Sequence, residues 1–477
     1  MRIRHRMPAL IALIAIAGGM SSPRLAPAAT AKVQVKFSVM TGFPAPGTPA
    51  NLNRVGVLKT GDPKAKNVLV LNPGTSAGAA YFEPLARTIA KMLPDWQVWA
   101  VERRENFLED QSELNLFKRG RVSPTGLFNF YLGYLSDPSV TNHYNPVPDS
   151  AVPFARQWGM NVEIQDLRRV VKAAAAHGRT VAMGGHSLGG SITTAYATWD
   201  FKGRAGGRDL SGLVLIDGFS SPTPVTPDQA NTSLADLQTK SPWLSFGGIP
   251  APYAGLFGTV GAGLTKVAPN SPSVLASWPL LPATLKGPPG INPTNEAGFG
   301  YDTDAKTSPP SLIAAQVHTG QLAASGDPRG WVRAGAITPI QRWASMFSGW
   351  GLQNVDGTAW YHPMRLTIDA GAVGDGVANP AQSVLDVHSI DGAKLRKRTR
   401  IYAFGAALGG PNVLAAARFL ARESGIPRRN LTLVNRQATY AHNDPNAAQP
   451  KVNAFLKRLI PFLRGISVGK ESTGKQK

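Results

Sequence analysis

The sequence predicts an α/β fold in which helices cover both faces of a parallel sheet. Short continuous apolar runs, such as residues 67–71 (NVLVL) and 213–216 (LVLI), are typical of strands that are buried on both faces. Segments with helical spacing of their apolar residues lie between such runs, as at residues 79–93. This alternation favours parallel strands that are joined by helical crossovers.

The predicted elements follow one another in a regular order. Alternating or continuous apolar stretches predict strands at residues 33–39, 54–59, 67–71, 97–101, 180–183, 213–216, 400–404 and 431–435. Helical spacing predicts helices at residues 79–93, 158–176, 188–199, 413–423 and 452–463.

The alternation stops between residues 219 and 395. This segment is rich in Pro, Gly and Ser and carries six of the ten Trp residues. It is too long for a loop and too aromatic for a disordered segment, so we expect a large cap inserted between the sixth and seventh strands. The expected parts are a signal peptide at 1–31, core segments at 32–218 and 396–465, the cap at 219–395 and a mobile tail at 466–477.

The N-terminus has the pattern of a cleaved export signal. Three early Arg residues precede a short apolar stretch at residues 9–17, and Ala-x-Ala cleavage sites follow at 26–28 and 29–31. No later run of about 18 apolar residues occurs, so we expect no transmembrane segment after signal removal. The expected location is secreted, periplasmic or in the cell envelope of a bacterium, and an uncleaved N-terminal anchor is the alternative.

Composition excludes several classes of site and partner. The chain has no Cys, which excludes disulfides, thiolate metal sites and a lipidated cysteine. The formal net charge is +21, and removal of residues 1–31, with four Arg and no acid, leaves +17. This charge favours contact with an anionic envelope surface. We expect no nucleic acid as a partner, because the basic residues are mostly dispersed and no nucleic-acid-binding motif is found.

The strongest functional motif is Gly-His-Ser-Leu-Gly at residues 185–189, with a further Gly at 190. It matches the G-x-S-x-G nucleophile elbow, in which a sharp strand-to-helix turn exposes a serine hydroxyl. Small residues are needed two positions either side of the serine, because the chain passes close to itself there. A predicted strand precedes the motif and a predicted helix follows it, so we predict that Ser187 is the nucleophile.

A serine hydroxyl needs an adjacent base. Of the eight His residues, only His442 follows the last predicted strand, in the polar loop Tyr-Ala-His-Asn-Asp-Pro at residues 440–445. The chain order serine, acid, histidine that accompanies such an elbow requires a late histidine. We therefore predict that His442 is the general base.

The third member of the triad should be a carboxylate that orients the histidine. The loop after the seventh strand, residues 405–412, contains none. Asp217 directly follows the sixth strand and satisfies the order serine, acid, histidine. We predict Asp217 as the acid, and the alternatives are Asp386, Asp391 and Asp444.

Two backbone N–H groups should form the oxyanion hole. One belongs to Leu188, the residue after the nucleophile. The other should come from the loop after the third strand, residues 72–78, where Gly74 or Thr75 is the candidate. This loop lacks the Gly-Lys-Ser/Thr ending of a nucleotide site, so we expect no nucleotide there.

Two other features have alternative interpretations. The charged run at residues 99–105 either lines the rim of the pocket or, as is more usual, forms paired charges on a surface loop. The Trp residues of the cap, with segment 360–366, either line an apolar acyl or aromatic pocket or fill the cap's own core. No cluster of residues has the spacing of metal ligands, so we expect no metal.

Gly-His-Ser-Leu-Gly-Gly at residues 185–190, Asn-Pro-Gly-Thr at 72–75 and the late Ala-His at 441–442 together resemble the α/β-hydrolase superfamily. The resemblance covers residues 33–218 and 396–464 and leaves the cap unmatched. It implies an eight-stranded, mostly parallel sheet, a Ser-His-acid triad and no cofactor. The elbow is similar to those of lipases, esterases and thioesterases, whereas haloalkane dehalogenases and epoxide hydrolases have aspartate at the nucleophile position. The missing acid after the seventh strand is a departure from the usual pattern.

These features predict an exported serine hydrolase that cleaves small-molecule or lipid carboxylic esters through an acyl-enzyme intermediate. An acyltransferase with the same triad, acting on envelope lipids or sugars, is one alternative, because a sequence does not show how well a pocket excludes water. A non-catalytic binding protein of the same fold is another. An amidase or peptidase is less favoured.

Overall fold

The computed structural model describes residues 33–473, so the predicted signal peptide lies outside the described residues. The strands of the main sheet are β1 (Val35–Thr41), β2 (Arg54–Thr60), β3 (Asn67–Asn72), β4 (Trp96–Glu102), β5 (Thr180–His186), β6 (Gly212–Ile216), β9 (Arg400–Gly405) and β10 (Leu431–Asn435). A small hairpin pairs β7 (Gln321–Leu322) with β8 (Trp331–Val332). Every predicted strand is present in the main sheet, with its ends shifted by a few residues.

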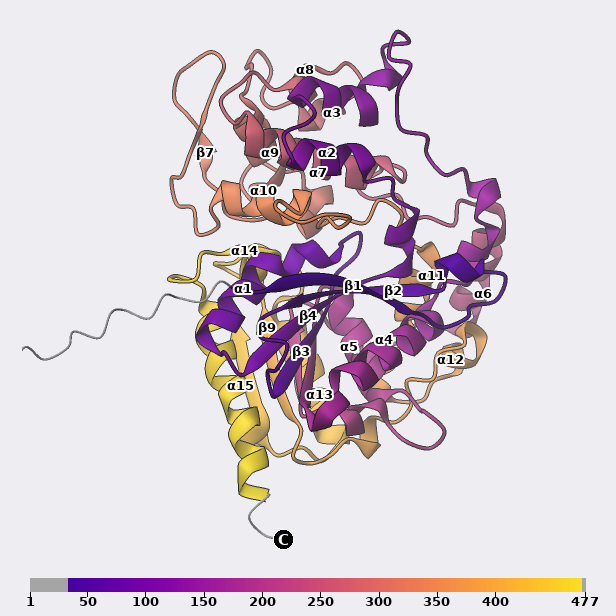
Figure 1. The fold of residues 1–477 in the computed structure, drawn as a ribbon. Coiled ribbons are helices and arrows are strands. Elements are labelled where there is room, and N and C mark those ends of the chain that lie inside the picture. The colour runs from indigo at the N-terminus through magenta and orange to yellow at the C-terminus, as the bar shows by residue number, and fades with distance from the viewer. Residues whose placement is uncertain (1–32, 474–477) are drawn as a thin grey trace, which may run out of the picture. The chain divides into compact units, whose positions relative to one another are not determined.

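The main sheet has the strand order β1-β2-β4-β3-β5-β6-β9-β10 (Figure 1). Strand β2 is antiparallel to both of its neighbours, β1 and β4. All the other pairs are parallel. The predicted eight-stranded, mostly parallel sheet is therefore confirmed, and its parallel strands bring their carboxyl ends to one edge.

Helices cover both faces of this sheet, as the sequence predicts. The α-helices are α1 (Glu83–Met92), α2 (Ser112–Lys118), α3 (Pro124–Tyr131), α4 (Met160–Ala174), α5 (Leu188–Thr198), α6 (Pro227–Thr239), α7 (Tyr253–Val267), α8 (Val274–Ser277), α9 (Asn295–Thr303), α10 (Ile340–Ser348), α11 (Met364–Ala370), α12 (Pro380–Leu385), α13 (Gly410–Glu423), α14 (Asp444–Ala447) and α15 (Ala454–Thr473). Helices α4, α5 and α13 bury their apolar sides against one face. Helices α1 and α15 bury theirs against the other.

Helix α15 is longer than the sequence pattern indicates. We expected the last helix to end near residue 463, with a mobile tail from 466, but α15 continues to Thr473. Ile466 belongs to the buried apolar cluster of this face and packs beside Gly212 at the start of β6. The first added turn is therefore anchored by packing that a local pattern does not reveal.

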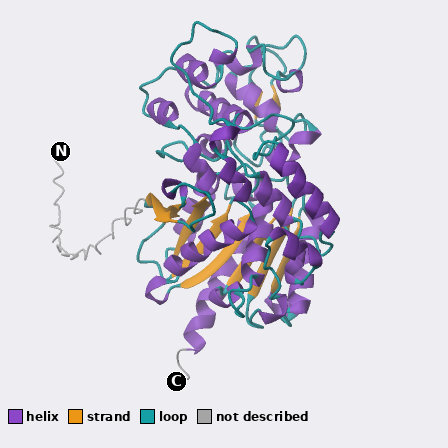
Figure 2. Ribbon diagram, turned by 90° about the vertical axis from the view of Figure 1, so that its right-hand side faces the viewer, coloured by secondary structure: helices purple, strands orange, loops and turns teal. Residues whose placement is uncertain are grey.

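The segments between β4 and β5 and between β6 and β9 build the part of the protein that lies beyond the carboxyl ends of the strands. Figure 2 shows that this upper part consists of helices joined by long loops, with the small hairpin among them. Helix α7 lies at its centre and packs against α3, α9 and α10. Helices α6, α11 and α12, which also belong to residues 219–395, instead pack on one another and beside α4 and α5. The predicted cap segment thus divides between the upper part and the flank of the core.

The Trp residues of residues 219–395 contribute to packed interiors. Trp243, Trp278, Trp343 and Trp360 are buried, and none of the six lines the cavity described below. Of the two alternatives, filling of an apolar interior is therefore the one that the structure supports.

No helix within residues 33–473 is long and apolar enough to span a membrane.

Candidate active site

Ser187 lies at a sharp turn between β5 and α5. Its backbone angles are φ 55° and ψ −126°, a sparsely populated conformation that stores strain. A Cβ atom at Gly185 would overlap the carbonyl group of Gly189, and one at Gly189 would overlap that of Asn72. The glycine positions of the motif are thus required by the turn, which brings Ser187 to the wall of a cavity.

His442 lies in the loop between β10 and α14, and its side chain is fully buried. Its Nδ1 atom is 2.7 Å from Oδ2 of Asp217. Its Nε2 atom has no hydrogen-bond partner among the described residues, although His442 lines the same cavity as Ser187. When Nδ1 donates a proton to a carboxylate, Nε2 carries the lone pair that a general base needs.

Asp217 directly follows β6, as the sequence indicates. Its carboxylate accepts backbone N–H groups from the loop after β9: Ala406 (2.6 Å), Gly409 (3.0 Å) and Gly410 (3.2 Å) donate to Oδ1 and Leu408 (3.1 Å) donates to Oδ2. Burial alone would raise the pKa of this carboxyl, but the hydrogen bond and charge of His442, with the amide of Ala406, hold it below its ordinary value. The loop that lacks an acid therefore supplies the amides that keep Asp217 ionised.

His186, to which the sequence analysis assigned no role, contacts the candidate base. Its ring lies against that of His442, with 4.2 Å between ring centroids. Burial lowers the pKa of His186 to about 3, so the ring is neutral, and its Nε2–H donates to the backbone carbonyl of His442 at 2.9 Å. The other nitrogen of His186 lies 3.2 Å from the hydroxyl of Tyr81, and this hydroxyl donates its proton to Oδ1 of Asn443. These contacts fix the backbone on which His442 sits.

The two predicted sources of the oxyanion hole both adjoin Ser187. Leu188 is the first residue of α5, where a backbone N–H has no partner within the helix. A Cβ atom at Gly74 would come within 2.9 Å of the Cβ of Ser187, so only glycine allows this approach. Gly74 and Thr75 both line the cavity with Ser187.

Arg103, immediately after β4, holds the loop that contains Gly74. Its guanidinium donates to the carbonyl oxygens of Pro73 (3.0 Å), Gly74 (2.8 Å) and Ala77 (3.4 Å), and its Nε pairs with Glu105 at 2.7 Å. Both side chains are almost completely buried. With three carbonyl groups turned toward Arg103, the loop has a fixed backbone orientation.

The charged run at residues 99–105 is thus not a surface loop, and that interpretation is wrong. Glu102, Arg103, Arg104 and Glu105 are each about 2% exposed or less. Glu102 accepts the backbone N–H of Ala79. The charges are paired, as we expected. Their partners, however, include backbone groups and Asp166, which are distant in sequence.

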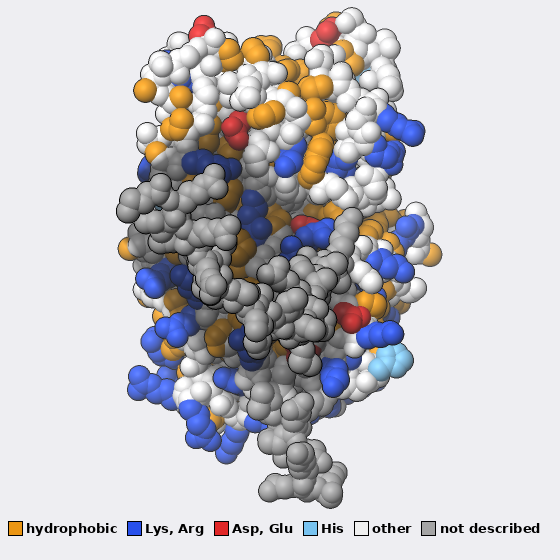
Figure 3. Space-filling model, turned by 60° about the vertical axis from the view of Figure 1, so that its left-hand side comes forward, with side chains coloured by type: hydrophobic (Ala, Val, Ile, Leu, Met, Phe, Trp, Pro, Cys, Tyr) orange, Lys and Arg blue, Asp and Glu red, His pale blue; other side chains and the backbone are white. Residues whose placement is uncertain are grey.

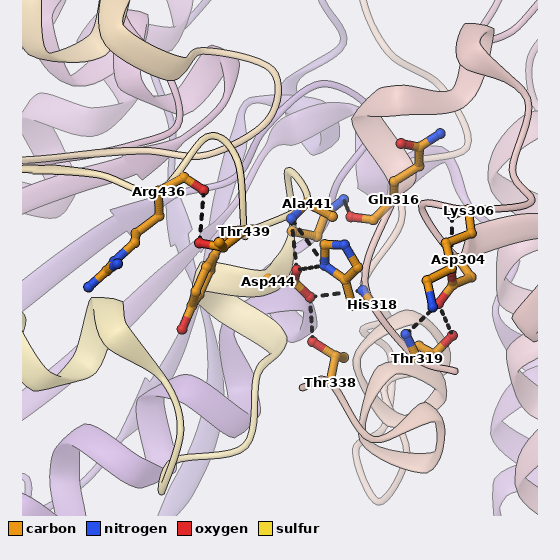
Figure 4. A network of polar contacts seen from close by, with 12 residues as sticks. Asp304, Lys306, Gln316, His318, Thr319, Thr338, Arg436, Thr439, Ala441 and Asp444 are labelled. Atoms are coloured by element: carbon orange, nitrogen blue, oxygen red, sulfur yellow. Dashed lines mark hydrogen bonds and ion pairs between the residues drawn. The ribbon is translucent and has the colours of Figure 1, made fainter. Parts of the chain in front are cut away.

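The alternative acids do not contact His442. Asp386 pairs with His388, and Asp391 pairs with Lys394. Asp444 bonds instead to other groups, among them the ring of His318 and the hydroxyl of Thr338 (Figure 4). It accepts Nδ1 of His318 (2.6 Å), the hydroxyl of Thr338 (2.7 Å) and the N–H groups of His318 (3.0 Å) and Ala441 (2.8 Å). Asp444 therefore ties the His442 loop to the segment that precedes β7.

The cavity at Ser187 is mostly apolar. Backbone and side-chain groups of Gly74, Thr75, Ser187 and His442 form one end of its lining. The large aliphatic and phenylalanine side chains of the lining come from residues 246–347, and they are Phe246, Ile249, Phe257, Leu275, Leu281, Leu285, Phe299, Leu312 and Phe347. Such a pocket suits an apolar substrate chain. Among residues 33–473, no three His, Asp or Glu side chains are grouped as metal ligands would be.

No family model and no curated protein matches the chain. Among solved structures, it is similar to a highly thermostable carboxyl esterase from Bacillus coagulans, with 12% identity, a TM-score of 0.40, and coverage of 90% of this chain and 98% of the other. It is also similar to epoxide hydrolase A from Mycobacterium thermoresistibile, with 12% identity, a TM-score of 0.40, and coverage of 91% of this chain and 99% of the other. A third similar structure is a soluble variant of monoglyceride lipase from Saccharomyces cerevisiae, with 10% identity, a TM-score of 0.37, and coverage of 92% of this chain and 97% of the other.

These similarities are remote, so we assign the fold from the chain's own topology. A parallel sheet flanked by β1 and the antiparallel β2, a strained serine turn after β5 and a long insertion before β9 occur together here. This combination of features shows that the chain has the α/β-hydrolase fold.

Proposed function

We propose that this protein is a serine hydrolase that cleaves carboxylic esters through an acyl-enzyme intermediate. The observation that carries the proposal is the state of His442: its Nδ1 is held by Asp217, while its unpartnered Nε2 belongs to a residue that lines a cavity with Ser187. A buried nitrogen without a partner is costly in a folded protein. Acceptance of the proton of the Ser187 hydroxyl would explain why this nitrogen has no other partner.

The proposed reaction has two steps of acyl transfer. Ser187 Oγ attacks the ester carbonyl while His442 Nε2 takes its proton, and the resulting oxyanion accepts hydrogen bonds from the amides of Leu188 and of Gly74 or Thr75. The C–O bond to the alcohol then breaks, and His442 returns the proton to the leaving oxygen. Water, deprotonated by His442, attacks the acyl-serine, and the acid leaves as Ser187 regains its proton. Asp217 stabilises the charged imidazole in each step.

An acyltransferase with the same residues is the second candidate. The apolar lining contributed by residues 246–347 supports it, because such a lining disfavours water as the attacking group. An alcohol would then replace water in the second step and leave as an ester. Product analysis in the presence of an alcohol acceptor separates the two reactions.

We also propose that residues 1–31 direct export, and that the mature protein contacts anionic envelope surfaces. The support is the signal pattern and the net charge of +21 for the whole chain. On the face shown in Figure 3, Lys and Arg side chains are spread widely, with few acids among them. N-terminal sequencing of the exported protein should begin at residue 29 or 32, and an intact N-terminus would contradict cleavage.

The proposed activity is tested with p-nitrophenyl esters of different acyl lengths and with a fluorophosphonate probe. The unmodified protein should turn over at least some esters and bind the probe covalently. Ser187→Ala should lose about 10⁴-fold or more in kcat and should not react with the probe.

Ser191→Ala is the matched control, since Ser191 lies one turn further along α5 and its hydroxyl donates to the carbonyl of Phe219. It should retain the activity of the unmodified protein. If the unmodified protein neither cleaves any ester nor reacts with the probe, the binding-protein alternative replaces the hydrolase.

A further inference from the structure

The cavity contains a carboxyl group that the proposed reaction does not use, that of Asp302 in α9. Helix α9 presents one face to the cavity, formed by Asn295, Gly298, Phe299, Asp302 and Thr303. Within the described residues, the Asp302 side chain has no hydrogen bond or ion pair, and its Oδ1 atom is closed to solvent. A polar group in an apolar cavity without any partner calls for an explanation.

The neighbouring Asp304 shows what a structural aspartate looks like here. Its Oδ2 accepts the N–H groups of Thr319 (2.6 Å) and Gly320 (3.0 Å), and its Oδ1 accepts that of Lys306 (3.0 Å), as Figure 4 shows in part. Asp304 therefore organises the chain on both sides of it. Asp302, two residues earlier, organises nothing in the described structure.

The position of Asp302 is also unfavourable for an acid. It lies in the last turn of α9, where the helix dipole disfavours negative charge. Burial raises the pKa of Asp302 well above its ordinary value, and no described cation offsets this effect. Asp302 therefore lowers the stability of the fold and makes no polar contact within it, a pattern that is typical of functional residues.

A second unsatisfied group lies on the same face of α9. Asn295 is two turns before Asp302, a separation of about 10 Å along the helix. Its Nδ2 donates to the carbonyl of Ala268 at 2.9 Å, which fixes the orientation of the amide, and its buried Oδ1 accepts no hydrogen bond within the described residues. Two residues of the cavity lining thus each carry a side-chain oxygen without a partner.

We propose that Asp302 and Asn295 are specificity residues that bind neutral hydroxyl or amide groups on an otherwise apolar substrate chain. This inference rests on the proposed function and names the class of substrate: esters whose chain carries hydrogen-bonding groups. A protonated carboxyl both donates and accepts, as hydroxyl and amide groups do, and the Oδ1 of Asn295 requires a donor. A cationic group is disfavoured by the net charge of +21.

The test compares straight-chain p-nitrophenyl esters with their ω-hydroxy and ω-amino counterparts, over a range of acyl lengths. The unmodified protein should prefer the ω-hydroxy ester at one length by about tenfold or more in kcat/KM, because the apolar chain leaves Asp302 unpaired. Asp302→Leu should abolish this preference while turnover of the plain ester persists. Asp302→Asn should keep part of it, since an amide also donates and accepts.

Thr303→Val is the matched control, because Thr303 lines the same cavity but its hydroxyl already donates to Phe299 within the helix at 2.7 Å. It should keep the preference. Asp302→Leu should melt at the same or a higher temperature than the unmodified protein, because it removes an unpaired carboxyl from an apolar cavity. A lower melting temperature would indicate a structural role and overturn the proposal.

Two further results would also overturn it: equal preferences in the unmodified protein and Asp302→Leu at every length, or a preference for the ω-amino ester. If no ester is cleaved at all, the proposed function fails, but the pocket is still tested. Calorimetry with Ser187→Ala should then show tighter binding of an ω-hydroxy alkyl amide than of the plain alkyl amide, and Asp302→Leu in that background should remove the difference.

Discussion

His442 has one ring nitrogen available for proton transfer, and the identity of that nitrogen is set by Asp217. Four backbone N–H groups fix the carboxylate, so it cannot turn away from Nδ1. The neutral His186 ring fixes the backbone of His442 from the other side. The tautomer with its lone pair on Nε2 is therefore built into the fold before any substrate binds.

Asp217→Asn should lower kcat by about 10³–10⁴-fold with little loss of folding stability. The amide oxygen can still accept three of the four loop N–H groups, those that donate to Oδ1. Its NH₂ group, in the place of Oδ2, would face Nδ1 of His442 and favour the tautomer with the proton on Nε2. That tautomer cannot accept the proton of Ser187. Steady-state kinetics, with circular dichroism as a folding check, measure both effects.

Asp391→Asn serves as the control, because Asp391 pairs with Lys394 and has no contact with His442. Its kcat should stay close to that of the unmodified protein. A larger loss in Asp391→Asn than in Asp217→Asn would reverse the assignment of the acid.

Ser187, His442 and Asp217 could be predicted as candidates from the sequence because each follows a recognisable strand and their chain order matches that of the fold. The amides around Asp217 could not, since backbone donors have no residue signature. Asp302 was missed for a different reason. A lone aspartate in an unassigned helix differs from the well-bonded Asp304 only in its contacts, which depend on tertiary structure.

At the scale of elements, the loop after β3 depends on a side chain that follows β4. Arg103 gathers three carbonyl groups of this loop, and peptide units whose carbonyls point to Arg103 direct their N–H groups elsewhere. The register of β3 and β4, which are paired in parallel, brings the ends of the two strands together. An oxyanion hole built on Gly74 or Thr75 would therefore depend on Arg103 as a positioning residue.

Arg103→Met should lower kcat by about 10²-fold, with a smaller change in KM, because an oxyanion donor acts mainly in the transition state. It should also lower the free energy of unfolding by about 3–5 kcal/mol, because Glu105 is left buried and unpaired. The double variant Arg103→Met, Glu105→Leu separates the two effects. Chemical denaturation should show recovered stability, whereas kcat should remain low; recovery of kcat would mean that Arg103 acts only on folding.

Strands were predictable because the sheet buries continuous apolar runs, and such runs are visible locally. The burial of residues 102–105 was not, because their partners lie at residues 73–79 and at Asp166. The division of residues 219–395 between the upper part and the flank of the core was equally hidden. This division depends on which helices pack against α7 and which pack against α4 and α5, and not on the composition of the segment.

At the scale of the whole described chain, one junction joins the His442 loop to residues 314–319. Asn443 donates to the carbonyls of Ala314 and Gln316, and Asp444 accepts both the ring and the backbone N–H of His318. The base and the wall of the cavity are therefore held to each other. A change in this junction would alter stability and the geometry of the site together.

The junction should weaken as the pH rises. The hydrogen bond to Asp444, with the charges of Asp444 and Asp304, raises the pKa of His318 above 6.5, against burial and Lys306. A raised pKa in the folded state gives stability that is complete below the ordinary value and lost as the pH passes through the raised one. Neutral His318 keeps its hydrogen bond to Asp444 but loses the positive charge, which lowers the free energy of unfolding by about 1 kcal/mol.

His318→Gln should accordingly be less stable than the unmodified protein at mildly acidic pH, and the difference should shrink as the pH rises above the pKa of His318. Thermal melts at several pH values measure this difference. His388→Gln is the control, because its pair with Asp386 is exposed and contributes little, so its melting temperature should follow the unmodified protein at every pH. A deficit in His318→Gln that stays constant with pH would mean that the ring acts through shape and hydrogen bonding alone, because only a charged imidazole makes the junction sensitive to protons.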